Sequence, residues 1–252
     1  MSGMASGMRE SGKLKTCEVF AALAAMCLIT ALLFTSLQYV CYHDYDMYRE
    51  EYEKYNVISN LPAGVKMTGE NSLMSVTEHM MKYLIGDKDT PDLQTKIDTA
   101  DGTRDFFNER ELLHMADCRI LFKKGLEIRY ICIMFAIFLL IYGRYAIIRK
   151  SGPFLKAAGR GMLIGSAVFF AAAAVLSLYV VLNFDRAFIQ FHEIFFDNDL
   201  WLLDPRESLL INILPEGFFF DIVKKTLWIF IPGSCLIVGA AAYLNRRYRG
   251  RE

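Results

Sequence analysis

The sequence predicts a mainly α-helical membrane protein with four transmembrane helices and a small α(+β) extracytoplasmic cap. The first observation is a set of four long apolar stretches, since about twenty apolar residues suffice to cross a ~30 Å hydrocarbon layer. A mean hydropathy of +0.26 and a hydrophobic content of 54% agree with that class. The second observation is that basic residues gather in alternate connections between these stretches. The apolar stretches are Cys17 to Val40, Ile128 to Ile148, Met162 to Phe184 and Thr226 to Leu244.

Lysine and arginine residues determine the predicted orientation. The N-terminal stretch, the link between the second and third spans and the C-terminal tail are basic, and that link contains no acid. The two other connections are acidic: residues 42–125 hold 16 acidic against 11 basic residues, and residues 185–222 hold 8 against 2. The positive-inside rule makes the basic side cytoplasmic. Both termini are therefore predicted inside, and both acidic connections outside.

The predicted chain alternates spans with connections. A cleaved signal peptide is not expected, because the first apolar stretch is too long and no A-x-A-like site follows it. The expected parts are a cytoplasmic N-terminus (1–16), the first span (17–41), extracytoplasmic segment 1 (42–125), the second span (126–148), a cytoplasmic loop (149–160), the third span (161–184), extracytoplasmic segment 2 (185–222), the fourth span (223–244) and a cytoplasmic tail (245–252).

Segment 1 is predicted to begin with two helices and a hairpin. A charged, tyrosine-rich stretch continues the helix of the first span until Leu61-Pro62 breaks it. Residues 72–85 carry apolar side chains at helical spacing, and Gly86 follows as a C-cap. Residues 87–103 alternate in polarity before a turn signal, which favours a short hairpin.

A third helix of segment 1 is predicted to start at Asn108, because Asn108 and Glu111 fit the capping-box spacing. His114, Asp117 and Cys118 then stand at i, i+3 and i+4, which places them on one helix face. This helix is expected to run on towards the second span.

Segment 2 is rich in aromatic residues. His192 lies beside a stripe of phenylalanines at helical spacing, which favours an amphipathic helix at the outer membrane interface. Asp204, followed by Pro205, is predicted to cap a new helix, and Pro215-Glu216 to start another that leads into the fourth span. The stripe consists of Phe184, Phe188, Phe191 and Phe195.

Several classes of function are disfavoured by what the sequence contains. All four histidines fall in the predicted external segments, and none has a usual metal-ligand spacing. His192-Glu193 begins like a zinc-protease motif, but position 196 is Phe. Phosphate loops, nucleotide-binding glycine motifs, GxSxG elbows and nucleic-acid-binding basic patches are not found. No acid lies in the middle of a span, which argues against a proton-coupled transporter. No metal or cofactor is predicted.

The external motifs resemble a known family. The sequence is similar to the lipoprotein intramolecular transacylases, bacterial membrane proteins with four helices. The resemblance rests on His114-Met115-Ala116-Asp117 and on a longer string that comprises Phe191-His192, Phe195-Phe196, Asn198-Asp199, Trp201, Leu203-Asp204-Pro205, Leu210-Ile211, Pro215-Glu216, Phe218-Phe219 and Asp221.

This resemblance implies an acyltransferase that uses His114 and His192 as acid–base catalysts. Family members move the sn-2 acyl chain of a diacylglyceryl-modified lipoprotein to the α-amine of its N-terminal cysteine. The implied partners are bacterial lipoproteins and membrane lipid, at the outer leaflet of the cell membrane. Asp117 or Asp199 is expected to orient an imidazole. The further supporting or substrate-binding candidates are Phe191, Phe195, Phe196, Asn198, Trp201 and Asp204.

The residues alone leave a second interpretation open. A non-enzymatic membrane chaperone or assembly factor would also use aromatic external helices, to bind a partner. His192 would then be an amphipathic anchor, and Asp199, Asp204 and Glu216 would be helix caps only. Which histidine removes the proton, the oligomeric state and the acyl-chain preference do not follow from the sequence.

Overall fold

The computed structural model describes residues 2–62, 73–89, 96–99, 102–147 and 151–249. The chain divides into two compact units. The first unit comprises Met1–Thr35, Glu127–Phe184 and Trp228–Glu252, and the second unit comprises Ser36–Leu126 and Asp185–Leu227.

Four long helices build the first unit: parts of α1 (Ser2–His43), α4 (Glu109–Tyr142) and α8 (Glu216–Arg247), and all of α5 (Ser151–Leu182). A π-helical turn, η2 (Gly143–Ile147), follows α4. Each of the four helices is long and apolar enough to cross a membrane. The prediction of a mainly helical protein with four candidate membrane-spanning helices is confirmed.

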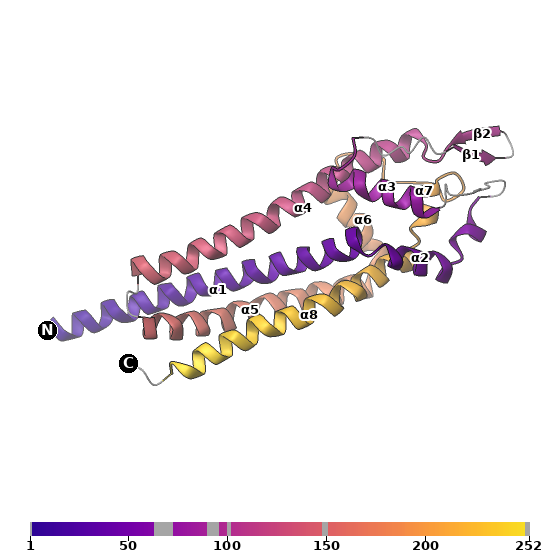
Figure 1. Ribbon diagram of the computed structural model, residues 1–252. Coiled ribbons are helices and arrows are strands. Elements are labelled where there is room, and N and C mark those ends of the chain that lie inside the picture. The colour runs from indigo at the N-terminus through magenta and orange to yellow at the C-terminus, as the bar shows by residue number, and fades with distance from the viewer. Residues whose placement is uncertain (1, 63–72, 90–95, 100–101, 148–150, 250–252) are drawn as a thin grey trace. The chain divides into compact units, whose positions relative to one another are not determined.

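Small residues let α1 and α5 pack closely (Figure 1). A Cβ atom at Gly165 would lie 2.2 Å from the carbonyl oxygen of Ala22, and one at Gly161 would lie 2.1 Å from that of Glu18. No side chain larger than hydrogen fits there without moving the helix backbone. Close backbone approach through small residues is a common way for helices to associate in a membrane, where apolar burial provides little driving force.

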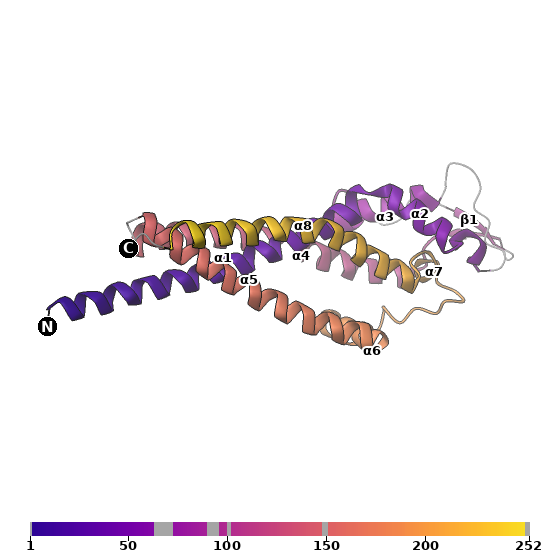
Figure 2. The ribbon, with the colours of Figure 1, turned by 90° about the horizontal axis from the view of Figure 1, so that it is seen from below.

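The other helix contacts of the first unit also use small side chains. Ala24 of α1 is fully buried in a cluster with Ala136 of α4, and a Cβ at Gly159 would touch the carbonyl oxygen of Ala241 in α8. The outward faces carry exposed large apolar residues such as Val175 and Trp228. Figure 2 shows these helices from below. Apolar side chains on the outside and small ones between helices are the pattern expected in lipid.

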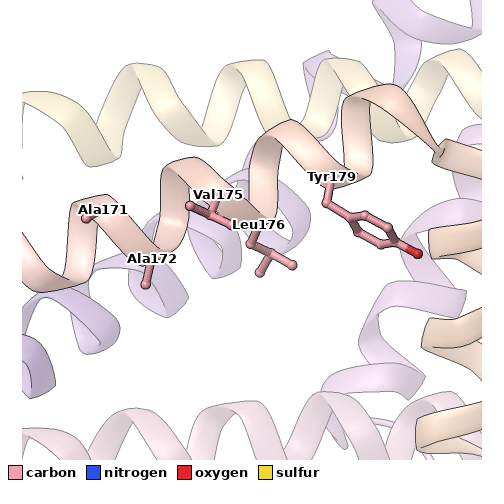
Figure 3. Close-up of a pocket in the computed structure, with 5 residues that line it drawn as sticks. All are labelled: Ala171, Ala172, Val175, Leu176 and Tyr179. Carbon is pink, nitrogen blue, oxygen red and sulfur yellow. The ribbon is translucent and has the colours of Figure 1, made fainter.

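One face of α5 borders an apolar hollow of about 680 Å³. Figure 3 shows the side chains that line it along the helix. Tyr179 carries the only titratable group among them. The hollow therefore offers a hydrocarbon-like surface and no acid–base chemistry. Its lining residues are Ala171, Ala172, Val175, Leu176 and Tyr179.

The second unit has a core of apolar side chains from α2 (Tyr45–Lys54), η1 (Val57–Asn60), α3 (Leu73–Ile85) and α7 (Leu209–Ile213), together with the ends of α1, α4 and α8. The unit also contains the strands β1 (Lys96–Thr99) and β2 (Gly102–Asp105) and nearly all of α6 (Phe184–Phe195). The fully buried members of the core include Met47, Tyr48, Met80, Phe106, Met115, Leu209, Ile213 and Phe218.

Several elements of the second unit start or end where the sequence predicts. The helix predicted over 72–85 is α3, and Gly86 follows it at a φ of +96°, the backbone conformation of a glycine C-cap. The antiparallel pair β1–β2 lies where the hairpin is expected, with Lys96 opposite Asp105 and Thr99 opposite Gly102.

Two predicted helix boundaries were wrong. The first span does not continue unbroken into the tyrosine-rich stretch, because Asp44 interrupts the helix and caps α2 by accepting a hydrogen bond from the Met47 amide. Asp204 caps no helix. It forms a turn in which it accepts from the backbone and side chain of Arg206, and α7 begins later with Ser208 as its N-cap. Short polar side chains favour turns as readily as caps.

Candidate active site

His114 and His192 meet within the second unit. They lie 78 positions apart in the sequence, on α4 and α6, yet their ring centroids are 6.1 Å apart, with ring planes inclined at 34°. Each histidine is only 8% exposed. Two buried titratable rings this close together can act on the same reacting group, as paired acid–base catalysis requires.

The position of His114 follows from the start of α4. Asn108 and Glu111 form the predicted capping box, in which each side chain accepts a hydrogen bond from the other residue's amide. One turn later, Nε2 of His114 lies 3.5 Å from Sγ of Cys118. The buried Nδ1 has no hydrogen-bond partner among the described residues. A buried polar atom left unpaired is rare, and a catalytic role is one explanation for it.

His192 is held by its own helix. Its Nδ1 lies 2.7 Å from the carbonyl oxygen of Phe188. A carbonyl only accepts, so Nδ1 carries the hydrogen and the neutral ring has its lone pair on Nε2. Burial lowers the pKa of His192 below its usual value, and the Phe188 hydrogen bond opposes this shift in part. His192 is therefore neutral near pH 7, with Nε2 available as a base.

Aromatic rings surround the two imidazoles. Trp201 stacks on His192 with centroids 4.7 Å apart, and Phe188 lies 4.2 Å from the same ring. Phe196 contacts both histidines, at 5.3 Å from His114 and 5.5 Å from His192. These rings exclude water from the histidine pair and lower the local dielectric, which strengthens every polar interaction there.

The two carboxylates that were predicted to orient an imidazole, those of Asp117 and Asp199, interact with other side chains instead. Asp117 accepts a hydrogen bond of 2.8 Å from the Asn198 side chain, and Asp199 lies 3.4 Å from the guanidinium of Arg110. Among the described residues neither carboxylate hydrogen-bonds to an imidazole; the Phe188 carbonyl orients His192 instead. Asn198 also accepts from the Trp201 indole through its carbonyl. These residues fix the chain after α6 rather than the rings directly.

The remaining candidates divide into a face of α6 and a surface turn. Phe191 and Phe195 are 43% and 52% exposed on the outer side of α6, where they lie beside or near His192. Asp204 lies outside the aromatic surroundings of the histidines. The Arg206 side chain lowers the pKa of Asp204 to about 2, so that this carboxylate stays ionised and holds its own turn.

Sequence analysis identified only one of the two interactions that Glu111 makes. The capping box explains one of its oxygens, but the other accepts hydrogen bonds from the Ser208 hydroxyl and the Leu210 amide. The only signal in the sequence was an acid at an N3 position, which is ordinarily exposed. Among the described residues, no group of three or more His, Cys, Asp or Glu side chains could hold a metal ion.

Comparison with known proteins identifies the family of the chain. The sequence profile of the family described as "Lipoprotein intramolecular transacylase Lit" matches residues 22–219. The chain belongs to this family. Lit proteins are acyltransferases, so the family decides between the enzyme and the chaperone interpretations in favour of an enzyme. No curated protein matches the sequence significantly.

Solved structures of a Lit protein share the fold. They are of the membrane-integral lipoprotein intramolecular transacylase from Bacillus cereus. One is 20% identical, with a TM-score of 0.65, and the match covers 92% of this chain and 97% of that one. Another, which carries a histidine-to-alanine mutation, is 21% identical, with a TM-score of 0.68 and 99% of both chains covered.

Proposed function

We propose that this Lit-family protein moves the sn-2 acyl chain of a diacylglyceryl-modified lipoprotein to the α-amine of its N-terminal cysteine. The observation that carries the proposal is the pair of buried, facing imidazoles of His114 and His192 in an aromatic enclosure. The transfer is an ester aminolysis within one molecule. It needs an amine freed of its proton, a stabilised oxyanion and a proton for the departing alkoxide.

His192 is the base in this mechanism. Its Nδ1–H is spent on the Phe188 carbonyl, so Nε2 is the free lone pair. Nε2 takes a proton from the α-ammonium, and the amine nitrogen then attacks the ester carbonyl carbon. The Trp201 ring stacked on His192 favours the imidazolium that results.

His114 is the donor. In this mechanism the Cys118 thiol, 3.5 Å from Nε2, is the donor of that contact, so the hydrogen of the neutral ring is on Nδ1, the atom without a partner among the described residues. This Nδ1–H stabilises the oxyanion that forms on the ester carbonyl. As the C–O bond breaks, Nε2 of His192 gives its proton to the sn-2 oxygen and then takes the second proton of the amine nitrogen, which it releases to solvent. The products are an amide, a free hydroxyl and one released proton, with no covalent enzyme intermediate.

Positioning and dryness supply the rest of the rate. Amine and ester belong to one molecule, so the enzyme only has to hold them in a reactive geometry, which can be worth a large effective molarity. Phe196 lies against both imidazoles and keeps water from the ester. Water would otherwise hydrolyse the ester and release a fatty acid.

The second unit lies at the outer leaflet of the bacterial cell membrane in this proposal, with both termini in the cytoplasm. The support is the charge asymmetry: its two segments are acidic, whereas the other connections are basic. α6 follows the candidate span of α5 after one residue, and its exposed phenylalanines suit the lipid interface. Substrate lipoproteins are anchored in that same leaflet.

Replacing either histidine by alanine tests the function. The substrate and product are isomers of equal mass, so the assay follows loss of the amine-reactive group and locates the acyl chain by tandem mass spectrometry. We expect His114→Ala and His192→Ala to slow conversion about 10²–10⁴-fold. His43→Ala, at an exposed histidine of the same unit, is the control. Conversion at the wild-type rate in both active-site variants would overturn the assignment.

A second pair of variants separates the two roles. Glutamine keeps an N–H donor but has no basic nitrogen at neutral pH. We therefore expect His114→Gln to retain more activity than His192→Gln, because only the role of donor survives the change. The opposite order would exchange the roles of base and donor.

A further inference from the structure

We propose that Glu111 is a positioning residue for acyl transfer, which fastens the chain around Ser208 to α4 and so sets where His192 stands relative to His114. This inference rests on the proposed function for its kinetic consequence. Its structural half, the fastening of the chain that carries Trp201 and His192, can be tested without any activity.

The carboxylate of Glu111 is fully buried, at 0% exposure. Its Oε2 accepts from the Asn108 amide at 2.6 Å. Its Oε1 accepts from the Ser208 hydroxyl at 2.6 Å and from the Leu210 amide at 2.7 Å. A buried acid is found almost only with such partners, because desolvating an unpaired charge is costly.

Three donors converge on two oxygens, and that number explains why the residue is an acid. The capping box of α4 needs a single acceptor, which glutamine would supply equally well. A carboxamide has one acceptor oxygen and one donor nitrogen, so with glutamine at least one buried N–H would face another donor. The need for a second acceptor oxygen therefore comes from the donors of segment 2 and not from the start of the helix.

The fastened chain leads directly to the active site. Leu209 and Ile213, next to the Glu111 contacts, are fully buried in the core of the second unit. In the other direction the chain runs back to Trp201, whose indole stacks on His192. His114 stands one helical turn after Glu111 on α4. One carboxylate thus joins the two sequence segments that each supply a histidine.

Two other contacts of α4 with this chain are exposed and weaker. Asp117 accepts from Asn198, and Arg110 lies 3.4 Å from the Asp199 carboxylate. Exposed polar pairs of this kind contribute little, since water and salt compete for them. A buried, charge-assisted set of hydrogen bonds is the stronger connection. Glu111 is consequently the residue that fixes the position of segment 2 relative to α4.

The test compares Glu111→Gln with Glu109→Gln in the full-length protein in lipid nanodiscs. Both changes remove one negative charge from the first turn of α4, but Glu109 is exposed. We expect Glu111→Gln to lower kcat at least about 10-fold with KM little changed, because sub-ångström misplacement of catalytic groups is costly. Glu109→Gln should leave both constants as in the wild type.

An activity-independent measurement uses Trp201 as a reporter. The chain has two tryptophans, so Trp228→Phe leaves Trp201 alone. Undocking the chain should expose Trp201 to a water-soluble quencher such as iodide, and should abolish the change in its fluorescence when the stacked His192 takes up a proton. Glu111→Gln is expected to show both effects in this background, and Glu109→Gln neither.

The outcomes separate this inference from the function. Unchanged Trp201 accessibility together with an unchanged kcat per folded molecule, even if the melting temperature falls, would overturn the positioning role and leave the function intact. A wild-type protein that fails to convert a diacylglyceryl lipopeptide would overturn the function, while the quenching result still decides the fastening. If Glu111→Gln does not fold, Ser208→Ala decides by the same criteria, because it removes one donor and leaves two.

Discussion

Replacing Gly165 by alanine should separate α1 from α5. The new Cβ would stand 2.2 Å from the carbonyl oxygen of Ala22, and 2.8 Å from that residue's Cα and carbonyl carbon. All three neighbours are backbone atoms, so no side chain can rotate away. Because real Cβ contacts essentially never fall below 3.0 Å, the two helices must move apart locally by roughly 0.8 Å.

This movement costs stability through steric overlap and through the loss of attractive contacts. Inserting one methyl group into a tight interface usually destabilises a protein by about 1–3 kcal/mol. Moving two helices apart also weakens the dispersion contacts on which helix association in lipid depends. We therefore expect Gly165→Ala to reduce the free energy of unfolding by an amount near the upper end of that range.

Thermal or detergent-induced unfolding of the purified protein measures the change. Gly239→Ala in α8 is the matched control, because a Cβ there meets nothing within 4 Å, and alanine favours the helix over glycine by about 0.8–1 kcal/mol. The control should be neutral or slightly stabilising. Equal melting temperatures for the two variants would refute the close-packing argument.

Two further predictions concern the site. Burial lowers the pKa of His192 in the folded protein. As the pH falls, His192 is therefore protonated first in the unfolded chain, near pH 6.5. The contribution of neutral His192 to stability is thus present above that pH and is lost as the pH falls through the folded pKa. The acidic limb of the rate should likewise lie below pH 6.5, and His192→Gln should remove the corresponding part of the stability change in unfolding experiments across pH. Phe196→Ala should destabilise the fold by about 3 kcal/mol or more and let water reach the ester, so that fatty acid release rises relative to transfer. Phe196→Leu keeps most of the side-chain volume and should release less fatty acid. Equal release by the two variants would contradict a role of Phe196 in excluding water.

The parts of the fold that the sequence predicts are those set by local chemistry. Four apolar stretches require helices in lipid, because backbone groups must be satisfied within the segment. The capping box at Asn108 and the C-cap at Gly86 each depend on a few neighbouring residues, and both are present. The partner of a helix face, by contrast, is decided by packing between distant segments.

The errors and omissions have that common cause. Asp44 and Asp204 both carry a side chain that can cap a helix or close a turn, and only the surrounding packing decides between the two. The pairing of His114 with His192 rested on a family resemblance, since residues 78 positions apart carry no local signal of it. The second oxygen of Glu111 is filled by donors 97 and 99 positions away, which no local pattern indicates.

The uncovered face of α6 has a consequence for kinetics. Phe191, Ile194 and Phe195 are exposed on the helix that carries His192, and they suit contact with acyl chains. Substrate and product of the proposed reaction both remain dissolved in the bilayer, so their encounter with such a face is a search in two dimensions. The relevant concentration is then the mole fraction of lipopeptide in the lipid. Diluting the vesicles with buffer should leave turnover unchanged, whereas diluting the substrate with inert lipid should slow it.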